Sequence, residues 1–308
     1  MDEASLPPYD FFFPVPDRTL TKKYRGKYFY VFHNKVALMK TSFGCPFNCK
    51  FCFCRKITGD IYHARPLAEV IDELQGIQEK EIYIVDDDFL LDPGRISSFI
   101  RLLKERDIRK KYLVYGRADF IAAHPDIIRG FKEVGLRTVI VGLESFFDDE
   151  LIDFNKRTTG SMNELAMKIL NKSGVDCYAA VIISPSWGYK EFEAAAKTMN
   201  ALGIKFVNLQ PLTPLKGTGI DVDEGSLVIK RSDFEKWDLA HVSIRPEKMS
   251  TAEFYRCILK LYEDIIYKPR HLFSFMKHPP AMQVKMYRGL RKVRKQYKSN
   301  IMGISANA

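Results

Sequence analysis

The sequence predicts an α/β fold built around a parallel sheet, and three observations support that prediction. The chain has 308 residues, of which 46% are apolar and 28% charged, a balance typical of a folded globular protein. In the middle of the chain, short apolar runs alternate with helix-like segments, which indicates parallel strands joined by right-handed crossovers. Unusual polar residues follow the apolar runs, as expected where parallel strands end at one edge. Such a sheet either closes as a barrel or stays open.

Six strands and the helices that connect them can be placed in order along the chain. The first strand leads into a group of cysteines, and the helix after them begins near Pro66, a residue suited to a first helical turn. The expected strands are 36–41, 82–85, 112–115, 138–143, 177–183 and 206–209. The expected helices are 66–78, 93–105, 125–134, 161–172 and 189–202.

Polar side chains directly after these strands predict a functional edge. Because the carboxyl ends of parallel strands meet at one edge of the sheet, functional groups gather there. A residue that simply begins a loop is the plainer explanation for any single position, but six positions together favour a shared site. These positions are Cys45, the run Asp86, Asp87 and Asp88, then Arg117, Glu144, Ser184 and Gln210.

Both ends of the chain depart from the alternating pattern, so we expect three parts. Residues 1–35 form an aromatic N-terminal extension, 36–215 the α/β barrel or sheet, and 216–308 a C-terminal helical extension with a helix at 250–267. Neither extension is long enough to bury a core alone, so both should pack on the middle part. The aromatic stretches 11–13 and 28–30 most simply cover the barrel, and a pocket for a lipid or a flat ring is the alternative.

The charge and hydropathy of the chain limit its location and its partners. No stretch reaches the roughly 18 apolar residues of a membrane span, and no signal peptide is recognisable, so we expect a cytoplasmic protein. Lysine and arginine total 48 against 38 acidic residues, a net charge of +10, which permits an anionic partner. The basic segment 285–298 carries a narrow apolar stripe that suits peripheral contact with an acidic membrane surface, whereas nucleic acid is less favoured. The plainer alternative is a solvent-exposed helix that packs on the rest of the protein through its apolar stripe.

Four of the six cysteines, at positions 45, 49, 52 and 54, lie within ten residues, which predicts metal binding rather than disulfides. Cys45, Cys49 and Cys52 form a C-x3-C-x2-C motif directly after the first strand. Three closely spaced thiolates can hold three irons of a [4Fe–4S] cluster and leave the fourth open. A zinc ribbon would require a second cysteine pair, which is missing, and no histidine pair for catalytic zinc occurs.

This motif resembles the signature of the radical S-adenosylmethionine (SAM) superfamily, with Phe51 in the place of the aromatic residue beside the adenine. The resemblance implies a partial (β/α)6 barrel of the TIM type. It also implies that SAM binds the open iron through its amino and carboxylate groups. Reduction of the cluster then cleaves SAM to a 5′-deoxyadenosyl radical that abstracts hydrogen. An enzyme of this kind is oxygen-sensitive and needs an external electron donor such as flavodoxin or ferredoxin.

The resemblance extends over nearly the whole chain, to the radical SAM portion of the cobalamin-binding class, which includes hopanoid methylases and the anaerobic magnesium-protoporphyrin cyclase. It is carried by residues 40–46, 84–89, 117–119, 142–145 and 212–218. By this resemblance, Asp87 or its neighbour meets the SAM amino group, Arg117 the SAM carboxylate and Glu144 the ribose. The chemistry agrees with these roles, because an ammonium group binds a carboxylate, a carboxylate binds a guanidinium and a diol binds hydrogen-bond acceptors. Asp86, Ser184 and Gln210 share the same edge and complete the expected cofactor-binding set.

Cobalamin itself is possible but not expected in this polypeptide. Members that bind it usually carry a preceding domain with an Asp-x-His-x-x-Gly loop, and that motif is missing from the sequence, which has 44 residues before Cys45. A separate subunit or an unusual site could still supply it.

Four residues are candidates for chemistry on the substrate. Cys54 lies two residues past the motif; as a fourth ligand it would exclude SAM and make the protein an electron carrier. Tyr115, Cys177 and Tyr178 lie on expected strands and could donate hydrogen to a substrate radical, although core packing is the plainer role. Our main hypothesis is a radical SAM enzyme acting on an unactivated C–H bond of a small or lipid-like substrate. The alternatives are cobalamin-assisted methyl transfer, RNA modification and non-catalytic electron transfer.

Overall fold

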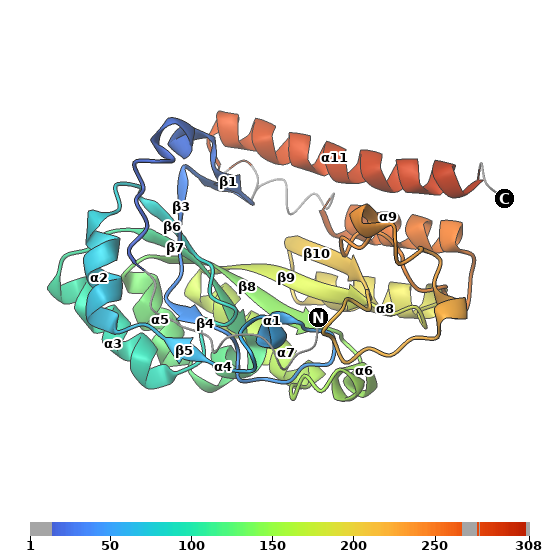
Figure 1. The fold of residues 1–308 in the computed structure, drawn as a ribbon, viewed down its shortest axis with the longest axis horizontal. Coiled ribbons are helices and arrows are strands. Elements are labelled where there is room, and N and C mark those ends of the chain that lie inside the picture. The colour runs from blue at the N-terminus through green and yellow to red at the C-terminus, as the bar shows by residue number, and fades with distance from the viewer. Residues whose placement is uncertain (1–13, 267–275, 277, 306–308) are drawn as a thin grey trace.

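A computed structural model describes residues 14–266, 276 and 278–305 of the chain (Figure 1). Its centre is a six-stranded parallel sheet in which the strands follow one another in chain order from β3 at one edge to β10 at the other. This order confirms the expected α/β fold of the partial (β/α)6 barrel type. The strands are β3 (Val36–Met39), β6 (Glu81–Ile84), β7 (Lys111–Arg117), β8 (Leu136–Glu144), β9 (Asp176–Ile183) and β10 (Phe206–Pro211).

Helices cover one face of this sheet. Apolar side chains from the helices and from alternate strand residues form one continuous hydrophobic core between the two layers. The connecting helices are α2 (Leu67–Gly76), α3 (Pro93–Glu105), α4 (Ala118–Ala123), α5 (Pro125–Glu133), α6 (Asp148–Asp153), α7 (Gly160–Ser173) and α8 (Tyr189–Ala201). The predicted helices at 93–105, 125–134, 161–172 and 189–202 agree within one or two residues at each end.

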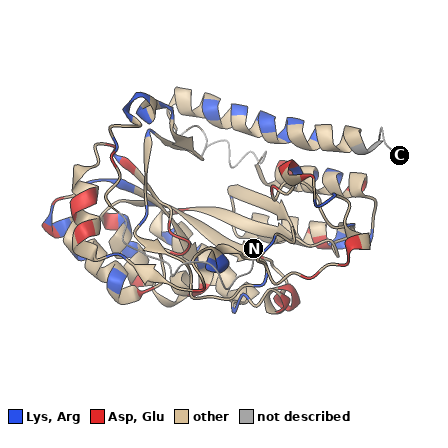
Figure 2. Cartoon of the chain, in the orientation of Figure 1, with Lys and Arg blue, Asp and Glu red and all other residues tan. Residues whose placement is uncertain are grey.

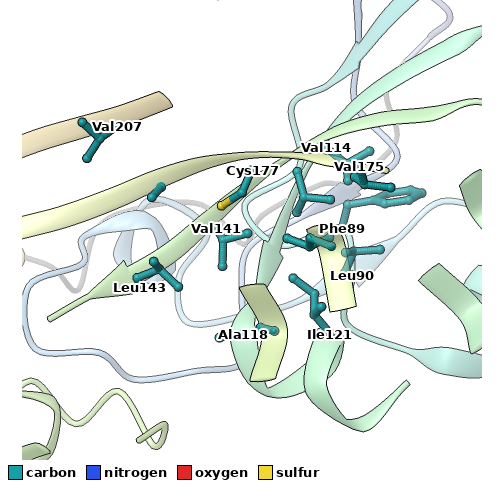
Figure 3. Close-up of a cluster of buried hydrophobic side chains, with 14 of the residues drawn as sticks. Phe89, Leu90, Val114, Ala118, Ile121, Val141, Leu143, Val175, Cys177 and Val207 are labelled. Carbon is teal, nitrogen blue, oxygen red and sulfur yellow. The ribbon is translucent and has the colours of Figure 1, made fainter. Parts of the chain in front are cut away.

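Alternation along the strands separates core residues from those that face the barrel interior. In β6, Ile82 and Ile84 belong to the helix-side core, whereas Tyr83 packs in a second cluster on the opposite face. In β9 the same alternation puts Cys177 in the helix-side core beside Val141 (Figure 3) and Tyr178 against the interior cluster. Cys177 therefore points away from the barrel interior, which removes it as a candidate hydrogen donor.

Short elements around the cysteines were not expected from the sequence. The predicted strand 36–41 ends two residues early, as β3 at Met39. A separate strand that was not predicted, β4 (Ser42–Phe43), follows it and pairs antiparallel with β5 (His63–Ala64). Helix α1 (Cys54–Ile57) lies between them in the chain. Two- and four-residue elements have too few positions to show a periodicity, so the sequence pattern could not reveal them.

The amino ends of the strands are closed by a small hairpin of β1 (Phe29–Tyr30) and β2 (His33–Asn34), which follows the 3-10 helix η2 (Lys22–Lys27). His33 is buried, and its ring nitrogens bond Glu81 Oε2 at 2.8 Å and Thr138 Oγ1 at 2.9 Å. These contacts fasten the hairpin to β6 and β8. The aromatic residues 11–13 lie outside the described part of the chain.

After β10 the chain forms two 3-10 turns, η3 (Glu224–Ser226) and η4 (Phe234–Lys236), and two long helices, α9 (Thr251–Ile266) and α11 (Pro280–Ser305). Tyr297 of α11 packs edge-on against Tyr255 of α9, and α11 lies across the molecule from the helix layer (Figure 1). Tyr262 of α9 reaches the free edge of β10, where its hydroxyl accepts a 2.8 Å bond from Leu209 N and donates to Leu209 O at 3.3 Å.

The division of the chain into three parts at residues 35 and 215 remains a prediction. No helix in the described ranges is both long and apolar enough to span a membrane.

Candidate functional site

The cysteine loop begins at a glycine that no other residue can replace without displacement of the backbone. Gly44 has a φ of +75°, and a Cβ at this position would lie 2.1 Å from the carbonyl oxygen of Ile61. The loop that follows carries Cys45, Cys49 and Cys52, all with free thiols. Cys49 is buried, whereas the other two are half-buried.

Two carboxylates at the end of β6 hold the start of this loop. Asp86 is buried and accepts bonds from Thr41 N at 2.6 Å, Thr41 Oγ1 at 2.5 Å and Ser42 Oγ at 2.8 Å. Asp87 Oδ2 accepts from Gly44 N at 2.9 Å and lies 3.6 Å from Lys40 Nζ. Both residues were predicted to bind cofactor, and in the structure they bond the segment that leads into the cysteines.

A second segment, residues 154–157, supports the loop from the other side. Lys50 N donates to the carbonyl of Phe154 at 2.9 Å, and the side chain of Asn155 donates to the carbonyl of Asn48 at 2.7 Å. Asn155 and Arg157 have φ values of +50° and +58°, an uncommon conformation for residues other than glycine. The strained turn is therefore a part of how the loop is positioned.

Arg117, at the end of β7, is buried against the same loop. Its Nη2 donates to the carbonyl of Lys156 at 2.6 Å, and its Nε donates to Asp119 at 3.0 Å. Nη1 lies 3.9 Å from Cys49 Sγ, and the ring of Phe47 lies 3.7 Å from the guanidinium carbon. The guanidinium thus lies beside the buried cysteine with one nitrogen directed at it.

Glu144, the last residue of β8, forms a buried ion pair with Lys156. The distance from Lys156 Nζ to Glu144 Oε1 is 2.9 Å, and both side chains are less than 10% exposed. Glu144 has a φ of +62°, and a Cβ on Gly142 would lie 2.2 Å from Glu144 Oε1, so the pair needs a glycine beneath it. Lys156 Nζ also lies 5.7 Å from the centre of the Phe51 ring. This lysine connects Glu144 to the aromatic residue of the cysteine motif.

Asp88 is the unpaired carboxylate of the site. It is 3% exposed, and neither of its oxygens has a hydrogen-bond partner among the described residues. Burial raises its pKa to about 7, while the positive charges of Arg117 and Lys156 act in the opposite direction. A buried carboxylate without a partner is costly, so this arrangement favours binding of a cationic group.

The remaining candidates from the sequence lie on the interior side of the barrel or near the loop. Ser184 follows β9 and bonds the hydroxyl of Ser186 at 2.8 Å, and Gln210 is half-buried on β10. Tyr115 accepts a 2.7 Å bond from the hydroxyl of Tyr83, and Tyr178 packs edge-on against Tyr30 with ring centres 6.3 Å apart. Cys54 begins α1, and its thiol interacts with Cys52 and with Asp87.

Sequence reasoning missed Lys156 and did not single out Asp88 from its neighbours. Lys156 lies between an expected strand and an expected helix, in a segment without periodicity, so only its ion pair with Glu144 reveals it. The three adjacent aspartates look equivalent in the sequence. Their hydrogen-bond partners separate them, because Asp86 and Asp87 bond the loop and Asp88 does not.

Comparison with known proteins identifies the family. The model of the radical SAM superfamily matches residues 39–199, which is more than half of the chain and includes the cysteine loop and the strands that carry Arg117 and Glu144. The chain belongs to the radical SAM superfamily. Enzymes of this superfamily use a [4Fe–4S] cluster and SAM, so the expectations of an enzyme and of these two cofactors are confirmed.

Several curated proteins resemble this chain over most of its length. The hopanoid C-3 methylase of Methylococcus capsulatus is 26% identical over 82% of this chain and 48% of its own. The anaerobic magnesium-protoporphyrin IX monomethyl ester cyclase of Rubrivivax gelatinosus is 25% identical over 82% of this chain and 46% of its own. The chain thus spans about half the length of these relatives. The resemblance stated from the motifs is confirmed at the level of the class.

Solved structures show the same fold. The cobalamin-dependent SAM radical enzyme OxsB, with aqua-cobalamin and SAM bound, superimposes with a TM-score of 0.59 at 14% identity, over 84% of this chain and 46% of its own. The radical SAM methyltransferase TsrM from Kitasatospora setae gives a TM-score of 0.51 at 19% identity, over 60% of this chain and 35% of its own.

The donor set of the loop fits a [4Fe–4S] cluster better than a single metal ion. Within the described part of the chain, no three His, Cys, Asp or Glu side chains converge as a single-ion site requires. In a cluster, each of three thiolates binds a different iron, so the ligands stay further apart. Burial raises the pKa of Cys49, and the charges of Lys156 and Arg117 act in the opposite direction. These cations would favour an anionic thiolate cluster at this place.

Replacement of Gly44 by alanine should abolish cluster assembly. The added Cβ would overlap the carbonyl of Ile61, and the positive φ disfavours alanine, so the backbone before Cys45 must shift. After anaerobic reconstitution, we expect the iron bound per Gly44→Ala monomer to fall several-fold below wild type. Gly76→Ala is the matched control, since a Cβ at the end of α2 meets nothing within 4 Å. Equal iron content in the two variants would contradict this role of Gly44.

Proposed function

We propose that this protein cleaves SAM reductively and uses the resulting radical to abstract hydrogen from an unactivated C–H bond of a small or lipid-like substrate. The unpaired carboxylate of Asp88 carries the proposal, because a buried anion beside the three cysteines is suited to the SAM ammonium group. When bound and reduced, the cluster supplies the electron that breaks the sulfonium bond of SAM. Cys45, Cys49 and Cys52 would hold the cluster.

The residues around Asp88 would orient the rest of SAM. Arg117 can direct Nη1 at the SAM carboxylate, because Asp119 and the Lys156 carbonyl hold its other nitrogens. Glu144, fixed by Lys156, can accept hydrogen bonds from the ribose hydroxyls. Phe51 packs against Phe154 with ring centres 5.6 Å apart, which fixes the ring expected beside the adenine. This scheme gives Asp86 and Asp87 a positioning role and assigns the ammonium contact to Asp88, the neighbour of Asp87.

The substrate would meet the radical inside the barrel, at the carboxyl ends of the strands. Tyr115, Tyr178 and Cys54 remain candidates for hydrogen transfer, and Ser184 and Gln210 would contact SAM or substrate. An external one-electron donor such as flavodoxin or ferredoxin would reduce the cluster, and we place the reaction in the cytoplasm under low oxygen.

Cobalamin-assisted methyl transfer is the second candidate, favoured by relatives named as methylases and by neighbours solved with cobalamin. Cobalamin would then come from another chain or site. RNA modification is a weaker alternative supported only by the net charge. Electron transfer without SAM would require Cys54 as the fourth ligand. The buried carboxylate of Asp88 would then have no cationic ligand to bind.

Anaerobic assays with SAM and a strong reductant test the reaction directly. We expect the reconstituted protein to release 5′-deoxyadenosine, and a Cys49→Ala variant to release none. S-adenosylhomocysteine formed in addition, only when cobalamin is added, would assign methyl transfer. Absence of both products from a protein with a full cluster would refute SAM cleavage and favour the electron carrier.

Substitution of two adjacent aspartates should separate SAM binding from cluster assembly. Asp88→Asn should weaken SAM about 10- to 100-fold, because a charged hydrogen bond contributes about 1.5–3 kcal/mol, and should leave iron content unchanged. Asp86→Asn should lower iron content, because three hydrogen bonds to the loop are disturbed. Perturbation of the cluster's electron paramagnetic resonance spectrum by added SAM gives the affinity. Wild-type SAM affinity in Asp88→Asn would exclude the proposed contact.

The outer face of α11 is proposed as a peripheral contact with an anionic membrane surface. Figure 2 shows Lys and Arg along this helix and no acidic residue on it. Among its exposed cations, Arg294 pairs with Glu263, whereas Arg288, Arg291, Lys292, Lys295 and Lys298 have no ion pair in the described structure. Tyr287 is 54% exposed and Val284 48% exposed on the same helix, and apolar side chains among cations favour a lipid surface over RNA.

Vesicle sedimentation tests this surface. The wild-type protein should bind vesicles rich in phosphatidylserine and leave neutral phosphatidylcholine vesicles unbound. The double variant Arg291→Glu and Lys295→Glu should lose at least tenfold in affinity, because each basic residue near the surface contributes about 1 kcal/mol. The control carries the same charge change on α7, as Lys168→Glu with Lys172→Glu. Equal losses in both double variants, or binding of RNA without vesicle binding, would exclude a membrane face on α11.

A further inference from the structure

A largely apolar cavity of about 360 Å³ lies between β1, β10, α9 and the inner side of α11. This volume is within the range of small-molecule sites. Tyr30 and Tyr178, which also pack against the interior cluster of the barrel, line it. Most of its walls are apolar, from Phe29, Phe206, Leu259, Tyr262, Met286, Leu290 and Val293.

Gly289 leaves this cavity open on the helix side. It lines the cavity in the middle of α11, and a Cβ built on it would meet no atom within 4 Å. Glycine in a helix interior is unfavourable by about 1 kcal/mol relative to alanine, so its place here needs a reason. Room for a ligand along the helix backbone supplies one.

A second cavity, of about 400 Å³, lies beside the first at the amino ends of β6, β7 and β8. Its lining includes three cations, Lys111, Arg137 and Lys285, and a single carboxylate, Glu81. That carboxylate is engaged by His33 at 2.8 Å and lies 4.0 Å from Lys111. Arg137 is exposed and has no ion pair within the ranges that the structure describes. The second cavity is therefore cationic.

Lys285 joins the two cavities, because it lines both. Its Nζ donates to Asn34 Oδ1 at 2.8 Å and lies 5.2 Å from the centre of the Phe29 ring. Its contacts are thus a neutral amide and an aromatic face, and its charge is not neutralised by a carboxylate in the described structure. An anion held in the second cavity would lie at the entrance of the apolar one.

The second cavity is remote from the cysteine loop. Arg137 lies near the start of β8 and Glu144 at its end, so seven strand residues, about 23 Å, separate them. In Figure 1, α11 and β1 likewise lie on the other side of the molecule from α1, which follows the cysteines. An anion held in the second cavity would therefore be distinct from SAM.

We propose that the two cavities form one binding site for an amphiphile with a single apolar chain and an anionic head group. The chain would lie in the cavity under α11, along Gly289, and a phosphate or carboxylate would lie against Arg137, Lys111 and Lys285. A ligand with only one of these two parts does not account for both cavities. A purely apolar ligand would leave the cations without a partner, and a free anion would leave the apolar cavity empty. The site does not depend on SAM cleavage.

Calorimetric titration of the reconstituted holoenzyme with dodecyl phosphate, below its micelle concentration, tests the site. We expect saturable binding of one molecule and binding at least 100-fold weaker for inorganic phosphate. Gly289→Phe, which fills the cavity, should weaken dodecyl phosphate at least tenfold. Gly303→Phe is the matched control on the same helix, where a Cβ also meets no atom within 4 Å and no part of the cavity is near.

A second pair of variants tests the head-group cavity. Arg137→Glu should weaken binding about tenfold or more, while Arg291→Glu on the outer face of α11 should leave it unchanged. No saturable binding by the wild type, or equal affinities of Gly289→Phe and Gly303→Phe, would overturn the proposal. So would equal losses in the two arginine variants, which would indicate attraction by net charge alone.

The source of the amphiphile follows from a parallel sedimentation assay with vesicles that contain lysophosphatidic acid, a membrane lipid with one acyl chain and a phosphate head group. Weaker vesicle binding by Gly289→Phe than by Gly303→Phe would support a membrane lipid as the ligand. Vesicle binding unchanged by Gly289→Phe, together with loss of dodecyl phosphate, would support a free amphiphile. Release of 5′-deoxyadenosine by the same samples reports separately on SAM cleavage.

Discussion

The arrangement of the site depends on the buried carboxylate of Asp86. It joins the end of β6 to the start of β4 and the residue before it through three hydrogen bonds, all from Thr41 and Ser42. Burial raises the pKa of Asp86, and these donors act in the opposite direction, so the hydrogen bonds offset the cost of a buried charge. Because Gly44 and Cys45 follow at once, the position of the cysteine loop relative to the sheet is set here. The neighbouring Asp87 extends the same restraint to Gly44.

Three adjacent aspartates thus have three environments on one strand end. Asp86 is satisfied by the loop and Asp87 bonds its glycine, whereas Asp88 is buried among groups that leave both its oxygens without a partner in the described structure. Across the sheet, Arg117 and the pair of Glu144 with Lys156 supply charges of both signs around the same space. A zwitterionic ligand with a diol matches this distribution. Glu144, Asn155 and Arg157 have positive φ values, so the turns beside these charged groups are strained.

Much of this could be predicted from the sequence, because parallel strands impose strong local patterns. The apolar runs located all six strands, and the rule that strands end at one edge brought Arg117, Glu144 and the aspartates together before any coordinates. The cysteine spacing identified the superfamily. What failed depended on side-chain direction and on contacts distant in the chain. The side chains of Cys177 and Tyr178 point to opposite faces of the sheet. In a strand that is apolar on both faces, the sequence does not show which of two neighbouring side chains faces the helices and which faces the barrel interior. Lys156 could not be predicted because its role depends on the ion pair with Glu144, which only the fold brings together.

The contact between Tyr262 and Leu209 bears on the solubility of an incomplete barrel. A sheet that does not close has a free edge strand, whose unpaired backbone groups can recruit a strand from another molecule. On β10, the hydroxyl of Tyr262 occupies both the N–H and the carbonyl of Leu209, and α9 lies along that edge. A single phenol therefore acts as a substitute for the missing neighbouring strand. Loss of that hydroxyl would leave the N–H and the carbonyl of Leu209 unpaired at the edge of the sheet, and such groups favour intermolecular strand pairing and aggregation.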